Sequence, residues 1–113
     1  MKYSDKQRIQ KICEYAEKLL DYINKNGITK EILLNDYAMQ WMVTTPLYNI
    51  GEQVYALSDE YKAMNSNIPW SMISGLRHRL VHNYDGTNWN IIADVVFEEL
   101  PILLEQLKKL FSI

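Results

Sequence analysis

The sequence is poor in several features, and each shortage excludes a class of protein. It has a single cysteine, Cys13, in 113 residues, so no disulfide can form within the chain. The first residues, from Met1 to Asp5, form no apolar signal segment, and no run of about 18 apolar residues occurs anywhere. We therefore expect a cytoplasmic protein without a membrane span.

Positive charge is also in short supply. The formal net charge is −2 at pH 7. Proteins that bind nucleic acid over a broad surface usually have a positive electrostatic potential there. The charge balance therefore argues against a broad, non-specific duplex-binding surface. It permits a small basic site, and Arg77, His78 and Arg79 are contiguous.

Strand-like alternation, internal repeats and low-complexity linkers are absent from the sequence, and apolar residues recur instead at steps of three and four. This period predicts helices over residues 4–26, 29–34, 35–58, 69–83 and from 88 to the end, with a polar frayed turn and loop over 59–67. We expect one all-α domain over residues 1–113, a HEPN-like bundle of four to five helices, where the family term rests on the resemblance described below.

Three residues punctuate these helices. Pro46 lies inside the expected helix 35–58, where its missing N–H should produce a kink near residues 44–45 or mark two abutting helices. Pro101 should restart or bend the last helix. Gly51 is typical of a close crossing between two helices.

The apolar stripes predict the core. On the first two long helices the stripe holds Ile9, Ile12, Cys13, Ala16, Leu19, Leu20, Ile23, Met39, Met42, Val43, Leu47, Ile50, Val54 and Leu57. On the later helices it holds Trp70, Ile73, Leu76, Leu80, Val81, Trp89, Ile91, Ile92, Val95, Val96, Phe97, Ile102, Leu103, Leu107, Leu110 and Phe111. Cys13 is expected to be a buried, inert thiol.

Large apolar side chains on or near the helix borders exceed what one small core needs. They are Trp41, Tyr48, Trp70, Met72 and Trp89. Exposed clusters of this kind mark interfaces, so we expect a two-fold homodimer.

The segment 75–86 concentrates the chemistry, because it holds both histidines and two arginines. His82 suits general acid–base catalysis because its ordinary pKa is near neutral. Arg77 can hold a phosphate and stabilise the charge that develops during its displacement. An arginine–histidine pair without a metal suits cleavage of RNA by its own 2′-hydroxyl.

The spacing leaves alternatives open. On a straight helix His82 lies about 140° from Arg77, so the helix must end near His82 or a second copy must supply the missing partner. His82 and Tyr84 could instead simply close a helix end, where a histidine interacts well with the helix dipole. A metal site at His78 and His82 is a further alternative, but no third ligand is evident and Arg79 stands where a zinc protease has glutamate.

The motif Arg77-x4-His82-x-Tyr84 resembles the signature of the HEPN superfamily, and within it the HepT-like toxins. The similarity extends upstream to Ile68-Pro69-Trp70 and Asn49-Ile50-Gly51-Glu52. Downstream it includes Trp89-Asn90-Ile91-Ile92 and Leu100-Pro101-Ile102-Leu103. The family commonly has asparagine after the arginine, where this chain has His78.

This resemblance implies a helical homodimer whose two motifs face each other across a cleft. It implies metal-independent ribonuclease activity that is toxic to the host cell, with RNA as substrate, no cofactor, and Arg77 and His82 as catalytic residues. His78, Asn49 and Glu52 are candidates for supporting roles.

The resemblance also implies a partner, a minimal nucleotidyltransferase antitoxin that neutralises the toxin by attaching adenylate to Tyr84. The alternative hypothesis is a non-catalytic module that uses the same basic cleft to bind a nucleotide or a nucleotidyltransferase partner. A purely structural bundle is the third, and it leaves the basic cluster unexplained.

Overall fold

The computed structural model describes residues 3–81 and 86–110, and the first helix begins where the sequence predicts. Helix α1 spans Asp5–Lys25. The Ser4 hydroxyl accepts a hydrogen bond from the Gln7 N–H at 3.1 Å, and the Gln7 side chain accepts one from the Ser4 N–H at 2.8 Å. This reciprocal pair satisfies two N–H groups that the first turn leaves unpaired. Gly27 follows the helix with a φ of 59°, a conformation that suits glycine.

Helices α2 and α3 also begin at side-chain caps. Helix α2 spans Lys30–Asn35, and the Thr29 hydroxyl accepts from the Ile32 N–H. Helix α3 spans Tyr37–Ala56 and is capped by Asp36. Because α3 runs through Pro46 as one helix, the alternative of two abutting helices is wrong.

The polar stretch after α3 is more ordered than its composition predicted. Helix α4 spans Asp59–Met64, because the Ser58 hydroxyl accepts from the Tyr61 N–H and caps it. Helix α5 spans Trp70–Val81 and begins one residue after Pro69, within the usual uncertainty of helix ends.

The C-terminal part forms one rod with an unexpected wide turn. Helix α6 spans Trp89–Asp94 and is capped by Asn88, whose side chain accepts from the N–H groups of Asn90 and Ile91. The π-helical segment η1, Val95–Glu99, follows, and helix α7 spans Leu100–Lys109. The Leu100 N–H donates to the Val95 carbonyl, five residues back. Pro101 explains this turn, since its ring has no N–H and would clash with the carbonyl of residue 97 in a regular helix.

Most predicted core residues are buried, and three of the exceptions lie on the helix borders. Cys13 is buried, as expected, and burial raises the pKa of its thiol to about 11, which disfavours the reactive thiolate at neutral pH. Leu20 is half-buried, whereas Ile91 and Ile102 are exposed. Each helical residue turns about 100° from the one before, so Ile102 lies off the stripe formed by its buried neighbours. Phe111 and the side chain of Val81 lie outside the described residues.

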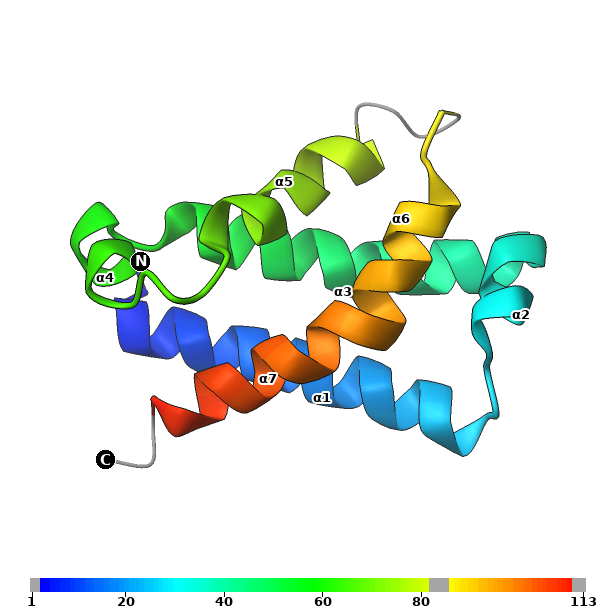
Figure 1. The fold of residues 1–113 in the computed structure, drawn as a ribbon, viewed down its shortest axis with the longest axis horizontal. Helices are drawn as coiled ribbons and strands as arrows, with labels where there is room; N and C mark the ends of the chain where they lie inside the picture. Colours follow the sequence, from blue (N-terminus) through cyan, green and yellow to red (C-terminus); the bar gives the residue numbers. More distant parts are fainter. Residues whose placement is uncertain (1–2, 82–85, 111–113) are drawn as a thin grey trace.

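The long helices pack into the all-α domain that the periodicity predicts (Figure 1). Helix α3 packs against both α1 and α5, and α7 lies against α1. The rod α6–η1–α7 passes diagonally across α1 and α3 in this view. Four long rods and the short helices α2 and α4 make up the described part of the chain. None of its helices is long and apolar enough to cross a membrane.

Candidate functional site

Arg77 lies where α5 crosses α3 at its closest. A Cβ atom placed on Gly51 of α3 would stand 3.1 Å from the Arg77 backbone nitrogen and 3.2 Å from the Ile73 carbonyl oxygen. Only a glycine permits this approach without a shift of one helix. The predicted role of Gly51 in a close crossing is therefore confirmed, and the crossing sets the position of Arg77.

The Arg77 side chain contacts two residues of α3. The carbon of its guanidinium group lies 3.8 Å from the centroid of the Tyr55 ring. One guanidinium nitrogen lies 3.9 Å from a carboxylate oxygen of Glu52, at the outer limit of an ion pair. About one third of each ionic side chain is exposed to solvent. The structure thus brings Glu52 to Arg77, as a supporting residue would require.

Glu52 has a second and shorter contact on its own helix. The Tyr48 hydroxyl donates a hydrogen bond of 2.6 Å to the same carboxylate oxygen that faces Arg77. This bond to the carboxylate, followed by partial burial, raises the pKa of Tyr48 above its ordinary value. Helical periodicity places Tyr48 and Tyr55 on the border of the apolar stripe of α3 and gives no other sign of this contact. Their spacing from Glu52, four residues before and three after, is the signal for one shared helix face.

The other two supporting candidates point elsewhere. The Asn49 amide donates to the Thr45 carbonyl of its own helix at 2.9 Å. His78, next to Arg77 on α5, is exposed and lines a separate hollow of about 360 Å³ together with Arg79, Thr87 and Asn88. The Thr87 hydroxyl donates to the Arg79 carbonyl at 3.2 Å, which ties the start of α6 to the end of α5.

The two remaining motif residues, His82 and Tyr84, lie outside the described residues. Helix α5 is described as far as residue 81, so His82 is the next residue in the chain and Tyr84 follows two positions later. Over residues 3–81 and 86–110, no group of three or more His, Cys, Asp or Glu side chains is placed to hold a metal ion.

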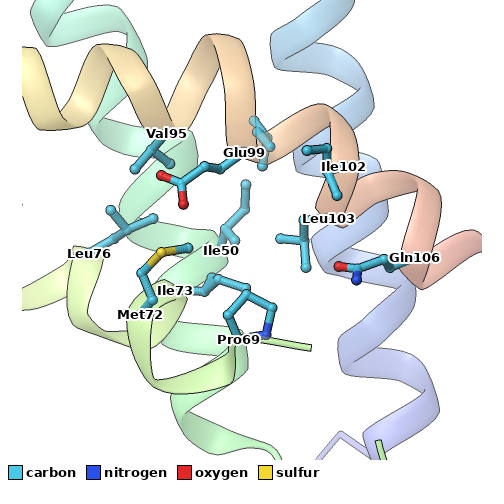
Figure 2. Close-up of a pocket in the computed structure, with 11 residues that line it drawn as sticks. Ile50, Pro69, Met72, Ile73, Leu76, Val95, Glu99, Ile102, Leu103 and Gln106 are labelled. Atoms are coloured by element: carbon cyan, nitrogen blue, oxygen red, sulfur yellow. The ribbon is translucent and has the colours of Figure 1, made fainter. Parts of the chain in front are cut away.

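A further pocket lies between α5 and the C-terminal rod (Figure 2). It measures about 160 Å³ and is lined mainly by apolar side chains such as Met72, Leu76 and Leu103. Glu99 is the charged group in its lining. Arg77 does not line it, so this pocket is separate from the arginine site.

The fold is all-helical over the described residues, and the motif arginine is held at a helix crossing. The family model described as "Ribonuclease HepT-like" matches residues 7–110, and the chain belongs to this HepT-like ribonuclease family. The predicted family is therefore confirmed.

Relatives with similar sequences have names of the same kind. A candidate RNase of Caldanaerobacter subterraneus subsp. tengcongensis is 31% identical over 92% of this chain and 91% of its own length. The "Probable ribonuclease HepT" of Thermococcus cleftensis is 29% identical over 97% of this chain and 98% of its own. A candidate RNase of Methanocaldococcus jannaschii is 29% identical over 89% of this chain and 82% of its own. No solved structure matches the chain.

Proposed function

We propose that this protein is a metal-independent ribonuclease toxin of a toxin–antitoxin pair. Arg77 and His82 would cleave RNA in a cleft between two copies of the chain. A nucleotidyltransferase antitoxin would neutralise the toxin by attaching adenylate to Tyr84. Membership of the HepT-like ribonuclease family supports the reaction class, and the motif Arg77-x4-His82-x-Tyr84 supports the assignment of residues.

The observation that carries the proposal is the setting of Arg77. Among the described residues, its side chain contacts the Tyr55 ring and the Glu52 carboxylate, the latter at the outer limit of ion-pair distance. Neither contact occupies the guanidinium N–H groups with short hydrogen bonds, so they can bind the two oxygens of a phosphate side by side. The closeness of α3 and α5 at Gly51 holds the backbone of Arg77 in place.

The proposed reaction needs one base, one acid and one fixed cation. His82 takes the proton of the RNA 2′-hydroxyl, and the 2′-oxygen attacks the neighbouring phosphorus. The bond from phosphorus to the 5′-oxygen breaks, and that oxygen leaves with a proton from an acid. The products are a 2′,3′-cyclic phosphate and a 5′-hydroxyl. Arg77 stabilises the extra negative charge on the phosphate oxygens during the displacement.

The exposed face of α3 supports the pairing of two copies. Tyr37, Trp41 and Tyr55 are 66%, 55% and 59% exposed. Glu52 is the one charged residue in the sequence of α3. Exposed aromatic residues and few charges are typical of the centre of an interface. Because Tyr55 contacts Arg77, a two-fold contact along this face would bring two copies of Arg77 to one cleft.

The structure changes which residues support that interface. Trp41 and Met72 are exposed and Tyr48 is half-exposed, as an interface on the helix borders requires. Trp70 is buried, and its indole nitrogen donates to the carbonyls of Lys62 and Asn65 at 3.2 and 3.0 Å. It is a core residue and not an interface residue. Trp89 is half-buried and packs against the core.

The test is RNA cleavage in excess chelator by the wild-type protein and by Arg77→Ala and His82→Ala. We expect each substitution to reduce cleavage about 10²–10⁴-fold while the circular dichroism spectrum is unchanged. Lys25→Ala, which removes an exposed cation on α1, is the control and should cleave like wild type.

Three results would decide against the proposal. Unchanged cleavage by His82→Ala would remove the assigned base. Loss of cleavage in chelator, restored by added metal, would favour the metal site at His78 and His82. The third result concerns wild-type protein that is free of the partner and carries no adenylate. If this protein binds RNA or a nucleotide but does not cleave RNA, the non-catalytic module is favoured.

A further inference from the structure

The Tyr55 ring limits how the Arg77 guanidinium can turn. A guanidinium carbon 3.8 Å from a ring centroid is within the range of a cation–π contact. A guanidinium that lies flat on a ring has one face covered and its N–H edge uncovered, because the donors lie in the plane of the group. An arginine side chain that is free to rotate loses rotamer entropy when a phosphate fixes it.

Glu52 is the group that could compete with a phosphate for the N–H donors of Arg77. Its carboxylate oxygen is 3.9 Å from the nearest Arg77 nitrogen, too far for a hydrogen bond. The same oxygen is 2.6 Å from the Tyr48 hydroxyl. The carboxylate is therefore hydrogen-bonded to Tyr48 and not to Arg77. Glu52 therefore keeps its negative charge near the arginine without closing a bidentate pair.

The three α3 residues share one helix face, at steps of four and three residues. On a helix such residues are neighbours, so Tyr48, Glu52 and Tyr55 form a row beside Arg77. We propose that Tyr48 and Tyr55 are positioning residues for the phosphate-binding arginine. Tyr55 holds the plane of the guanidinium, and Tyr48 holds the Glu52 carboxylate away from its N–H edge. This inference rests on the proposed function, in which Arg77 binds the RNA phosphate.

RNA affinity tests the role of Tyr55. The probe is a fluorescein-labelled single-stranded RNA of mixed sequence, and the parent protein is His82→Ala, which binds without cleavage. We expect Tyr55→Leu to weaken binding on the order of 10-fold and Tyr55→Phe to retain most of it. In Arg77→Ala protein, Tyr55→Leu should have no further effect, because the side chain that it positions is gone. Tyr22→Leu, at an exposed tyrosine of α1, is the matched control.

Two outcomes would overturn the role of Tyr55. If Tyr55→Leu weakens binding equally with and without Arg77, the ring contacts RNA directly. If it has no effect in either background, the cation–π contact does not position the arginine. Light scattering on each variant confirms that the compared proteins have the same association state.

A double-mutant cycle with Glu52 tests the role of Tyr48. Tyr48→Phe removes the 2.6 Å hydrogen bond, which frees the Glu52 carboxylate to pair with Arg77, and we expect RNA affinity to fall several-fold. Adding Glu52→Gln should restore it, because the competing charge is then absent. Equal losses from Tyr48→Phe in protein that keeps Glu52 and in protein that carries Glu52→Gln would contradict the proposed competition.

An NMR measurement separates this inference from the proposed function. The Tyr55 ring should shift the Arg77 Nε–H resonance, and Tyr55→Leu should remove that shift without any RNA present. If the wild-type protein binds no RNA but the shift is found, the proposed function fails while the contact stands. If RNA binds and no ring-dependent shift exists, the positioning role is wrong.

Discussion

At the scale of single residues, the site depends on side chains that the sequence identified for different reasons. Arg77 and Glu52 were selected by the motif and by the Ile-Gly-Glu stretch, and the structure places them 3.9 Å apart. Tyr55 belongs to no motif, yet its ring centroid lies 3.8 Å from the carbon of the guanidinium. A contact between an aromatic ring and an arginine of another helix leaves no signature in a linear motif, because the two residues lie far apart in the sequence.

The role of Tyr84 is a prediction that belongs to one hydroxyl group. Tyr84→Phe removes the only oxygen of that side chain, so a nucleotidyltransferase partner should no longer modify the protein. We expect wild-type protein co-expressed with the partner to gain the mass of adenylate and Tyr84→Phe to gain none. The variant should also remain toxic in cells when the partner is present, because adenylate can no longer occupy the place of the RNA phosphate beside Arg77.

The result would be different if the partner acted without this modification. Full neutralisation of Tyr84→Phe that depends on the partner's enzymatic activity, or adenylate mapped to another residue, would show that Tyr84 is not the target. A catalytically inactive partner is the control for neutralisation by binding alone.

At the scale of helices, two glycines in different surroundings predict opposite effects. Gly51→Ala places a Cβ 3.1 and 3.2 Å from backbone atoms of α5, which cannot move aside as a flexible side chain could. We expect a loss of about 1–3 kcal/mol in the free energy of unfolding, measured by urea denaturation, and reduced RNA cleavage because Arg77 moves with α5.

Gly75→Ala is the matched control on α5 itself. Its Cβ would meet nothing within 4 Å. Alanine is the better helix former, so this change should stabilise the protein by about 0.5–1 kcal/mol. Equal effects of the two substitutions would show that the close crossing at Gly51 does not restrict the packing of α3 and α5.

The junction of α1 and α4 gives a stability effect that depends on pH. Asp5 accepts hydrogen bonds from the Ser58 hydroxyl at 2.7 Å and from the Ser58 N–H at 2.9 Å. These bonds, the hydroxyl first, lower the pKa of Asp5 below its ordinary value of 3.8. A lowered pKa in the folded state means that the ionised carboxylate stabilises the fold above pH 3.8 and loses this effect as the pH falls further.

We therefore expect Asp5→Asn to lower the free energy of unfolding by about 0.5–1 kcal/mol at pH 7, a small value because the site is exposed to solvent. The difference from wild type should shrink as the pH falls below 3.8. Urea denaturation at pH 7 and at a pH below 3.8 measures this difference in the free energy of unfolding. A difference that stays constant with pH would assign the effect to something other than the charge of Asp5.

At the scale of the whole molecule, the exposed aromatic face of α3 predicts the association state. Trp41 stands at 55% exposure in this face and packs edge-on against Tyr37, with ring centroids 4.8 Å apart. We expect wild-type protein to be a dimer at micromolar concentration by light scattering. Trp41→Lys should weaken the dimer about 30-fold or more, because a charge in the centre of an apolar contact must be desolvated.

Tyr22→Lys is the control for this prediction, since it places the same charge at an exposed aromatic position on α1. It should leave the dimer intact, and both variants should keep the helical circular dichroism spectrum. A wild-type monomer at this concentration, or a dimer that resists Trp41→Lys, would remove α3 as the interface.

The sequence by itself determined most helix starts and most of the core. Ser4, Thr29, Asp36 and Asn88 cap the helices that follow them, as their side chains predict. These features depend on residues within a few positions of one another, so a local pattern contains the information. The motif that points to the family is local for the same reason.

Only the tertiary structure decided how the arginine site is assembled. The row of Tyr48, Glu52 and Tyr55 meets Arg77 because Gly51 lets two helices approach, and that distance is absent from any local pattern. Which of the large aromatic residues near the helix borders are buried, as Trp70 is, and which are exposed, as Trp41 is, is likewise a consequence of packing. Periodicity tells which face of a helix is apolar, whereas the shape of the neighbouring helices determines what each face contacts.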